Sequence, residues 1–285
     1  IVSLFLVQLA GCTYVQSFSP SPTPTATLPP TSTPTLTPTP TITPTPTEPP
    51  FYVNATYFSG ELQVPILIYH QFFPDAYGPT DATRMQLSEF QNELQTFYEE
   101  GFSLISLKSW IDGTFVVPAG RKPLVLTIDD GWYGDQLFIE DDGTPSDITG
   151  IGLLWKFSQE HPDFGFHVAV FAVMGDHYYS DKQVGDRFLI SDGQDWYSSI
   201  WRKKLGNTIV WALEHGVEVY NHTLLHPNLG TISNSEIQRQ LWENDWVVRD
   251  LLDEVGRNDL IPQLDNAIAL PEGKWPSTQS GMRVL

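Results

Sequence analysis

Residues 123–131 read PLVLTIDDG, an apolar run that ends in two adjacent carboxylates and a glycine. The apolar part is typical of a buried strand. Asp129 and Asp130 repel each other, and an apolar strand would hold them in a partly dry place. A bound cation would remove that conflict. The alternative is a solvated turn, because Asp-Gly is common in turns.

A second polar motif, NHTLLHP at 221–227, follows the apolar stretch VEVY at 217–220. We predict that His222 and His226, four residues apart on one helical turn, face the same side and share one metal ion. The pair alone is weak evidence, because the chain has seven histidines. With Asp130 it gives two imidazoles and one carboxylate, a ligand set that leaves positions open for water and substrate.

Apolar patterns on both sides of these motifs predict alternating strands and helices. Strands are expected at 64–69, 102–107, 123–128, 166–173, 217–220 and 267–270, and helices at 87–100, 107–111, 150–160, 200–214 and 233–254. Ser233 and Glu236 form a capping-box pattern at the start of the last helix. Such alternation predicts a parallel α/β sheet or barrel, whose active site lies at the carboxyl ends of the strands.

The first part of the chain has a different composition. Residues 1–11 are apolar and lead into Cys12, and LAGC at 9–12 resembles a bacterial lipobox, whose cysteine receives a lipid. The alternative is the tail of a transmembrane anchor. Residues 19–50 are almost entirely Pro, Thr and Ser, which cannot bury a core and favour an extended chain.

We therefore expect three parts: a signal-peptide remnant with its lipobox at 1–12, a disordered Pro/Thr/Ser-rich linker at 13–59, and a catalytic domain at 60–285. The chain starts with Ile and stops at Leu285, so we interpret it as a fragment that lacks the C-terminal part of this domain. The expected location is the extracellular face of a bacterial membrane, through a lipid anchor, with secretion as the alternative.

The charge balance and the single cysteine exclude several classes of function. Fifteen Lys and Arg residues against 34 Asp and Glu residues give a net charge of −19. Such a surface repels nucleic acid and anionic lipid, so we expect no nucleic-acid partner and membrane contact only through the anchor. One cysteine rules out a disulfide within the chain and a Cys-based zinc cluster. No protein partner is predicted.

TIDDG and HTLLHP resemble the TFDDG and H-[ST]-x-x-H motifs of the polysaccharide deacetylase (NodB-homology) family, carbohydrate esterase family 4. VPILIYHQF and LSEFQNELQTFYEEGFSLISL resemble its extracellular branch, which includes poly-N-acetylglucosamine deacetylases. The resemblance runs from about residue 64 to 276. It implies a NodB-like distorted (β/α) barrel, with an N-acetylated extracellular or cell-wall polysaccharide as the substrate.

The resemblance also implies roles for individual residues. Asp130, His222 and His226 would bind a divalent metal, usually zinc, and Asp129 would be the general base for a metal-bound water that attacks the N-acetyl carbonyl. The third family motif, R-x-P-x-G, corresponds to ALPEG at 269–273, with Ala269 in place of the arginine. This departure puts the orientation of Asp129 in doubt.

In that third motif the backbone N–H of Glu272 would be the oxyanion donor, and Pro271 would contact the substrate. The histidine that serves as general acid in a late family motif is not seen, since no histidine follows His226. We expect that motif beyond the end of this chain.

A few other residues have two readings each. His70 would lie at the rim of the site and contact substrate, or pack in the core. Trp132 would stack on a sugar, or fill the barrel mouth. Residues 134–150 look like an inserted loop that shapes substrate choice. The remaining histidines are interpreted as structural: His161, His167, His177 and His215.

Two other functions stay open at this point. One is an esterase that removes O-acetyl groups from xylan-type glycans. The other is a non-catalytic glycan-binding lipoprotein that retains the fold.

Overall fold

The computed structural model describes residues 64–132, 134–175, 199–264 and 266–285. The predicted signal remnant with Cys12, the linker and His177 lie outside these ranges. Statements about the structure refer to the described residues.

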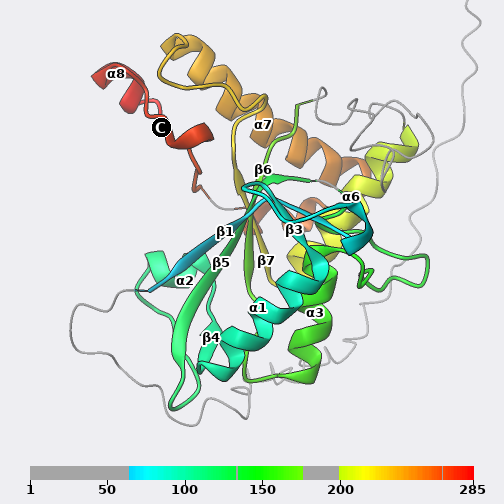
Figure 1. The fold of residues 1–285 in the computed structure, drawn as a ribbon. Helices are drawn as coiled ribbons and strands as arrows, with labels where there is room; N and C mark the ends of the chain where they lie inside the picture. The colour runs from blue at the N-terminus through cyan, green and yellow to red at the C-terminus, as the bar shows by residue number, and fades with distance from the viewer. Residues whose placement is uncertain (1–63, 133, 176–198, 265) are drawn as a thin grey trace, which may run out of the picture. The chain divides into compact units, whose positions relative to one another are not determined.

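Strands and helices alternate along the chain as predicted (Figure 1). The strands are β1 (Ile66–Tyr69), β2 (Gln71–Phe73), β3 (Arg84–Gln86), β4 (Phe102–Leu104), β5 (Lys122–Gly131), β6 (Val168–Ala172) and β7 (Val217–Asn221). The α-helices are α1 (Leu87–Glu99), α2 (Leu107–Ile111), α3 (Gly150–Glu160), α6 (Ser199–Glu214), α7 (Asn234–Glu254) and α8 (Gln279–Met282). Short 3₁₀ helices are η1 (Asp75–Tyr77), η2 (Asn258–Gln263) and η3 (Pro271–Gly273).

The main sheet is parallel, with strand order β1-β5-β6-β7, and β4 pairs with the start of β5. This spatial order follows the order of these strands in the sequence. A β/α barrel has such an order, whereas a doubly wound sheet reverses direction at a switch point. The predicted parallel α/β class is confirmed, and the described strands form an open arc of such a barrel.

The two faces of the sheet bury different side chains, because successive residues of a strand point to opposite sides. Leu124, Leu126 and Ile128 of β5 lie in the larger core with side chains from α1, α3, α6 and α7. Val125 lies on the opposite face, in a smaller core with Phe171 of β6 and Tyr220 of β7. By the same alternation, Asp129 and His222 point to the face of the sheet that carries this smaller core.

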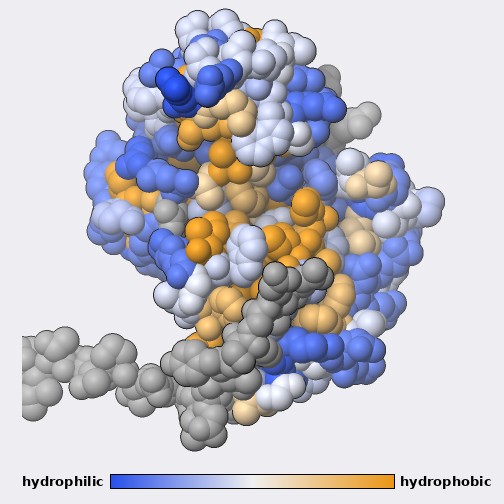
Figure 2. Space-filling model, turned by 90° about the vertical axis from the view of Figure 1, so that its left-hand side faces the viewer, coloured by the Kyte–Doolittle hydropathy of each residue, from blue (hydrophilic) through white to orange (hydrophobic). Residues whose placement is uncertain are grey.

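Strand β1 is an edge of the arc. Its side chains Ile66 and Ile68 are 40% and 60% exposed. Figure 2 views the side on which β1, α2 and α8 lie, and shows apolar surface gathered in the middle of this face. The described residues leave this edge of the sheet uncovered.

Helix α7 begins as its sequence predicts. The Ser233 hydroxyl accepts a hydrogen bond from the Glu236 N–H at 3.2 Å, which satisfies one of the free N–H groups of the first turn. The reciprocal half of the capping box is absent, because the Glu236 carboxylate pairs with Arg239 instead. The cap is therefore confirmed, and the box is not.

Two predicted strands need correction. Strand β5 runs to Gly131, so both carboxylates belong to its end and do not follow it. The predicted strand at 267–270 is a single bridge between Asn221 and Ile268, flanked by two backbone hydrogen bonds to Asn221. Pro271 follows directly, and its lack of an N–H prevents the ladder from continuing.

No helix in the described ranges has both the length and the apolar character needed to cross a membrane.

Candidate metal centre

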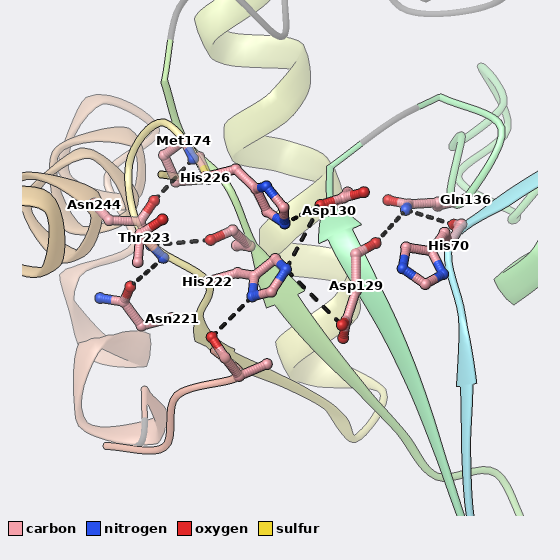
Figure 3. A network of polar contacts seen from close by, with 12 residues as sticks. His70, Asp129, Asp130, Gln136, Met174, Asn221, His222, Thr223, His226 and Asn244 are labelled. Atoms are coloured by element: carbon pink, nitrogen blue, oxygen red, sulfur yellow. Dashed lines mark hydrogen bonds and ion pairs between the residues drawn. The ribbon is translucent and has the colours of Figure 1, made fainter. Parts of the chain in front are cut away.

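Asp130, His222 and His226 lie together at the carboxyl ends of β5 and β7 (Figure 3). Asp130 Oδ1 is 3.6 Å from Nε2 of each histidine, and the three ligand atoms all lie within 4.8 Å of one another. In a tetrahedral zinc site with bonds of about 2.0–2.1 Å, ligand atoms are about 3.3–3.4 Å apart. The three atoms therefore surround a point that a divalent ion would fit, as the sequence predicted.

The chemistry of the ligand atoms supports the same conclusion. Asp130 Oδ1 is buried and has no hydrogen-bond partner in the described part of the chain. A buried carboxylate oxygen without a partner is costly. A divalent cation would satisfy it and would accept two imidazole lone pairs at the same time. The residues present therefore fit a zinc-type centre.

His222 is the most buried ligand, with its side chain 2% exposed. Its Nδ1 lies 2.9 Å from the Ala269 carbonyl oxygen, which can only accept, so Nδ1 carries the proton and Nε2 keeps its lone pair. Ala269 replaces the arginine of the family motif, yet this contact uses only its backbone. The substitution therefore leaves the support of His222 intact.

Burial lowers the pKa of His222 to about 4, against the opposing effect of the Ala269 hydrogen bond. In the unfolded chain its pKa is near 6.5, so the unfolded state takes up this proton first as the pH falls. This residue alone therefore lowers the stability of the fold progressively between about pH 6.5 and about pH 4.

We expect the His222 ring to stay neutral from pH 8 down to about pH 5 in the metal-free protein. A titration of the imidazole C–H signals by NMR would measure this, with a His222→Gln variant to assign the signal. A midpoint near the ordinary histidine value would contradict the burial argument.

The HTLLH segment is not a helical turn, and that prediction is wrong. Residues 222–226 form an irregular loop in which Thr223 and His226 have φ angles of 70° and 50°. The histidines converge because the loop folds back on itself. A regular helix cannot contain left-handed residues, so the pairing of His222 and His226 was correct for a different geometric reason.

Left-handed backbone is concentrated at the predicted site. Among the described residues, the non-glycine residues with positive φ are Asp130, Thr223, His226 and Glu272. Each belongs to one of the three motifs identified in the sequence. A non-glycine residue in this region costs about 1–2 kcal/mol, and such strain tends to cluster at functional sites.

Asp129 lies beside the three ligands. Its Oδ2 is 3.8 Å from His222 Nε2, and its side chain is 15% exposed. Burial raises the pKa of Asp129 to about 6, the electrostatic interaction with the nearby His70 ring opposes this rise, and the charge of Asp130 adds to it. A carboxylate whose pKa lies near neutral is suited to accept a proton in a reaction.

The structure reveals two site residues that sequence reasoning missed, both at the start of the predicted inserted loop. Gln136 is fully buried, and its Nε2 donates to the carbonyl oxygens of His70 at 2.7 Å and Asp129 at 2.9 Å. Asp135, 3% exposed, accepts from the Phe72 N–H. The base of this loop therefore ties β1 to β5, and no local sequence pattern distinguishes it from the solvated part.

His70 follows β1, and its ring lies next to Asp129 in Figure 3. The expected place at the site is thus observed. Trp132 is 1% exposed, so it presents no face on which a sugar could stack, and its core-filling alternative is the one the structure favours. Pro271 is also buried, which corrects its expected role as a substrate contact.

Two other histidines have the predicted structural roles. His161 packs against Tyr98 and Phe157, and His215 stacks on Trp211.

No protein-family profile and no curated protein sequence matches the chain. Comparison with solved structures finds the Streptococcus pyogenes deacetylase PplD in complex with acetate, at 17% identity and TM-score 0.47, over 78% of this chain and 80% of that one. A de-N-acetylase from Aggregatibacter actinomycetemcomitans matches at 12% identity and TM-score 0.46, over 78% and 84%.

A polysaccharide deacetylase from Bacillus cereus matches at 17% identity and TM-score 0.41, over 66% of this chain and 47% of that one. The chain thus spans about half the length of the Bacillus cereus protein. These identities and scores are too low to transfer an activity to this chain. The function has to be argued from the metal centre itself.

Proposed function

We propose that residues 60–285 form the catalytic domain of a metal-dependent hydrolase that removes N-acetyl groups from a polysaccharide. The observation that carries the proposal is the convergence of three possible ligand atoms on one point, with the largely buried carboxylate of Asp129 beside them. A structural metal site needs only the ligands. The additional carboxylate, with its raised pKa, supports a hydrolytic site.

A divalent ion bound by Asp130, His222 and His226 would supply Lewis-acid chemistry, because it acidifies water and polarises an acyl oxygen. Asp129 would take the proton of the attacking water, whose oxygen forms a bond to the acetyl carbon. The bond from that carbon to the sugar nitrogen then breaks and the nitrogen accepts a proton. The products are acetate and a free amine.

His70 lies beside the proposed metal centre. Its ring lies next to Asp129, and its carbonyl oxygen is held by Gln136. We propose that His70 contacts the N-acetylated sugar at the rim of the site. The N–H of Glu272 remains the proposed oxyanion donor, and its left-handed backbone lies in the segment that supports His222.

The same centre would hydrolyse an O-acetyl ester, because water attack and proton transfer are the same in both reactions. The TIDDG and HTLLHP motifs, which resemble those of polysaccharide deacetylases, favour the N-acetyl substrate. The non-catalytic glycan binder is less well supported. Ala269 and the absence of a histidine after His226 argue for it, whereas Asp129 together with all three proposed ligands argues against it.

Acetate release from chitin oligomers and from acetylxylan, with and without a chelator, tests the proposal. We expect release from chitin oligomers, its loss with chelator, and its return when zinc is added. Release only from acetylxylan would support the esterase. Metal binding without release from either substrate would support the glycan-binding protein.

We further propose that the domain is held at the extracellular face of a bacterial membrane through a lipid on Cys12, or is secreted. The support is the LAGC motif and the Pro/Thr-rich composition that follows it. In a detergent–water phase partition, we expect the wild type in the detergent phase and a Cys12→Ala variant in the water phase. A variant that stays in the detergent phase as fully as the wild type would refute the anchor.

A further inference from the structure

One face of helix α7 contacts the loop that carries both histidines. Gln240 is 2% exposed, and its side-chain Oε1 accepts a hydrogen bond from the Leu225 N–H at 2.8 Å. Its backbone carbonyl accepts from the Leu224 N–H at 3.0 Å. Two consecutive amides between His222 and His226 are therefore held by one residue of a different element.

Asn244, one turn further along α7, connects the same helix to the end of β6 (Figure 3). It is 1% exposed, its Oδ1 accepts from the Met174 N–H at 2.8 Å, and its Nδ2 donates to the Ala172 carbonyl at 3.0 Å. That carbonyl also accepts from the His222 N–H at 3.0 Å. Asn244 thus fixes the acceptor that positions the backbone of His222.

A third contact starts from β7 itself. The Asn221 Nδ2 donates to the Leu241 carbonyl at 2.9 Å and to Asp245 Oδ1 at 2.7 Å, while its Oδ1 accepts from the Thr223 N–H at 2.7 Å. The left-handed residue Thr223 is therefore fixed through Asn221, which α7 holds in place. Without such contacts the loop would relax toward ordinary backbone angles, and the two rings would separate.

The segment after β6 closes the loop from another side. A Cβ added to Gly175 would lie 2.2 Å from the Leu224 carbonyl oxygen, which real Cβ atoms do not tolerate. The loop is thus packed against Gly175 and hydrogen-bonded to α7. Its freedom to move is restricted in both directions.

We propose that Gln240 and Asn244 are positioning residues of α7 that hold the HTLLH loop in its metal-binding shape before an ion arrives. The inference rests on the proposed metal centre. Neither residue is a ligand. Gln240 acts through the N–H groups of Leu224 and Leu225, and Asn244 acts through the Ala172 carbonyl, which accepts from the His222 N–H. Outer partners that orient metal ligands contribute about 10–100-fold to metal affinity.

The test compares Gln240→Met and Asn244→Leu with Val248→Ala. The first two remove the hydrogen bonds but keep a side chain of similar size. Val248 is a buried residue of α7 in the large core, and its truncation destabilises the helix without changing a loop contact. We expect zinc affinity to fall about 10–100-fold in both amide variants and to stay within about twofold in the control.

A second readout needs no metal. Amide hydrogen exchange of Leu225 should be at least about tenfold faster in metal-free Gln240→Met than in Val248→Ala, because the side-chain oxygen that accepts from this N–H is lost. If Gln240→Met does not fold, Gly175→Ala perturbs the same loop from the other side, and is expected to weaken zinc binding by a similar factor. Wild-type zinc affinity in these variants, or an equal loss in Val248→Ala, would overturn the inference.

The outcomes separate this inference from the proposed function. A wild-type protein that binds no zinc refutes the metal centre, whereas unchanged exchange of Leu225 in Gln240→Met refutes the role of α7. Zinc binding in the wild type with unchanged affinity in the amide variants refutes the role of α7 alone.

Discussion

Replacement of Asp130 by alanine is expected to abolish stoichiometric zinc binding and to reduce acetate release at least about 1,000-fold, or about 4 kcal/mol of transition-state stabilisation. The reason is that Asp130 Oδ1 lies 3.6 Å from Nε2 of each imidazole and supplies the anionic ligand atom of the three. Two neutral imidazoles remain, without the anionic ligand that offsets the charge of the ion. Metal content after dialysis and acetate release by the same sample would measure both effects.

A control and a second variant make this result specific. Asp112→Ala removes a carboxylate from an exposed turn and should leave zinc binding and activity unchanged. Asp130 has a φ of 57°, which alanine tolerates less well than Asp or Asn. Asp130→Asn keeps the shape and the backbone preference and removes only the charge, so its zinc affinity should also fall. Unchanged affinity in both variants would refute the assignment of this ligand.

Replacement of Asp129 by asparagine should reduce activity without loss of zinc, unlike replacement of Asp130. Zinc should still bind, since Asp129 contributes none of the three ligand atoms, but acetate release should fall about 100–10,000-fold because an amide cannot accept the proton. Metal content and kcat, measured on the same preparation, separate this outcome from the loss of the ion.

Asp112→Asn offers a matched exposed control for this exchange, and should keep full activity. An Asp129→Asn protein that retains more than about a tenth of wild-type kcat would show that another group accepts the proton. An Asp129→Asn protein without zinc would instead place Asp129 among the ligands.

The sequence predicted the helices well because each carries a strong local signal. Residues 107–111 and 150–160 are helices with the predicted bounds, and Ser233 caps α7. The strands of the main sheet were also located, since each is a short apolar run between turn residues. Their ends were less accurate, because the length of a strand depends on its neighbours in the sheet.

The grouping of Asp130, His222 and His226 was predictable from residue type and position, but its geometry was not. The HTLLH loop takes its shape from hydrogen bonds to Gln240 and Asn221, and Gln240 lies 15 residues after Leu225 in the chain. Gln136 shows the same limit. It is polar and follows the carboxylates, yet it is buried by contacts that no local pattern encodes.

Four non-glycine residues of the site have left-handed backbone, so a substitution that relieves this strain would raise stability and loosen the site. Thr223 is β-branched, so it is among the least tolerated residue types at its φ of 70°. A directed-evolution campaign that selects only for melting temperature would therefore favour glycine or asparagine at such positions. The heat-resistant variants it yields would hold the proposed metal-binding loop less rigidly. Any search for stable variants of this chain should therefore measure metal retention together with the melting temperature.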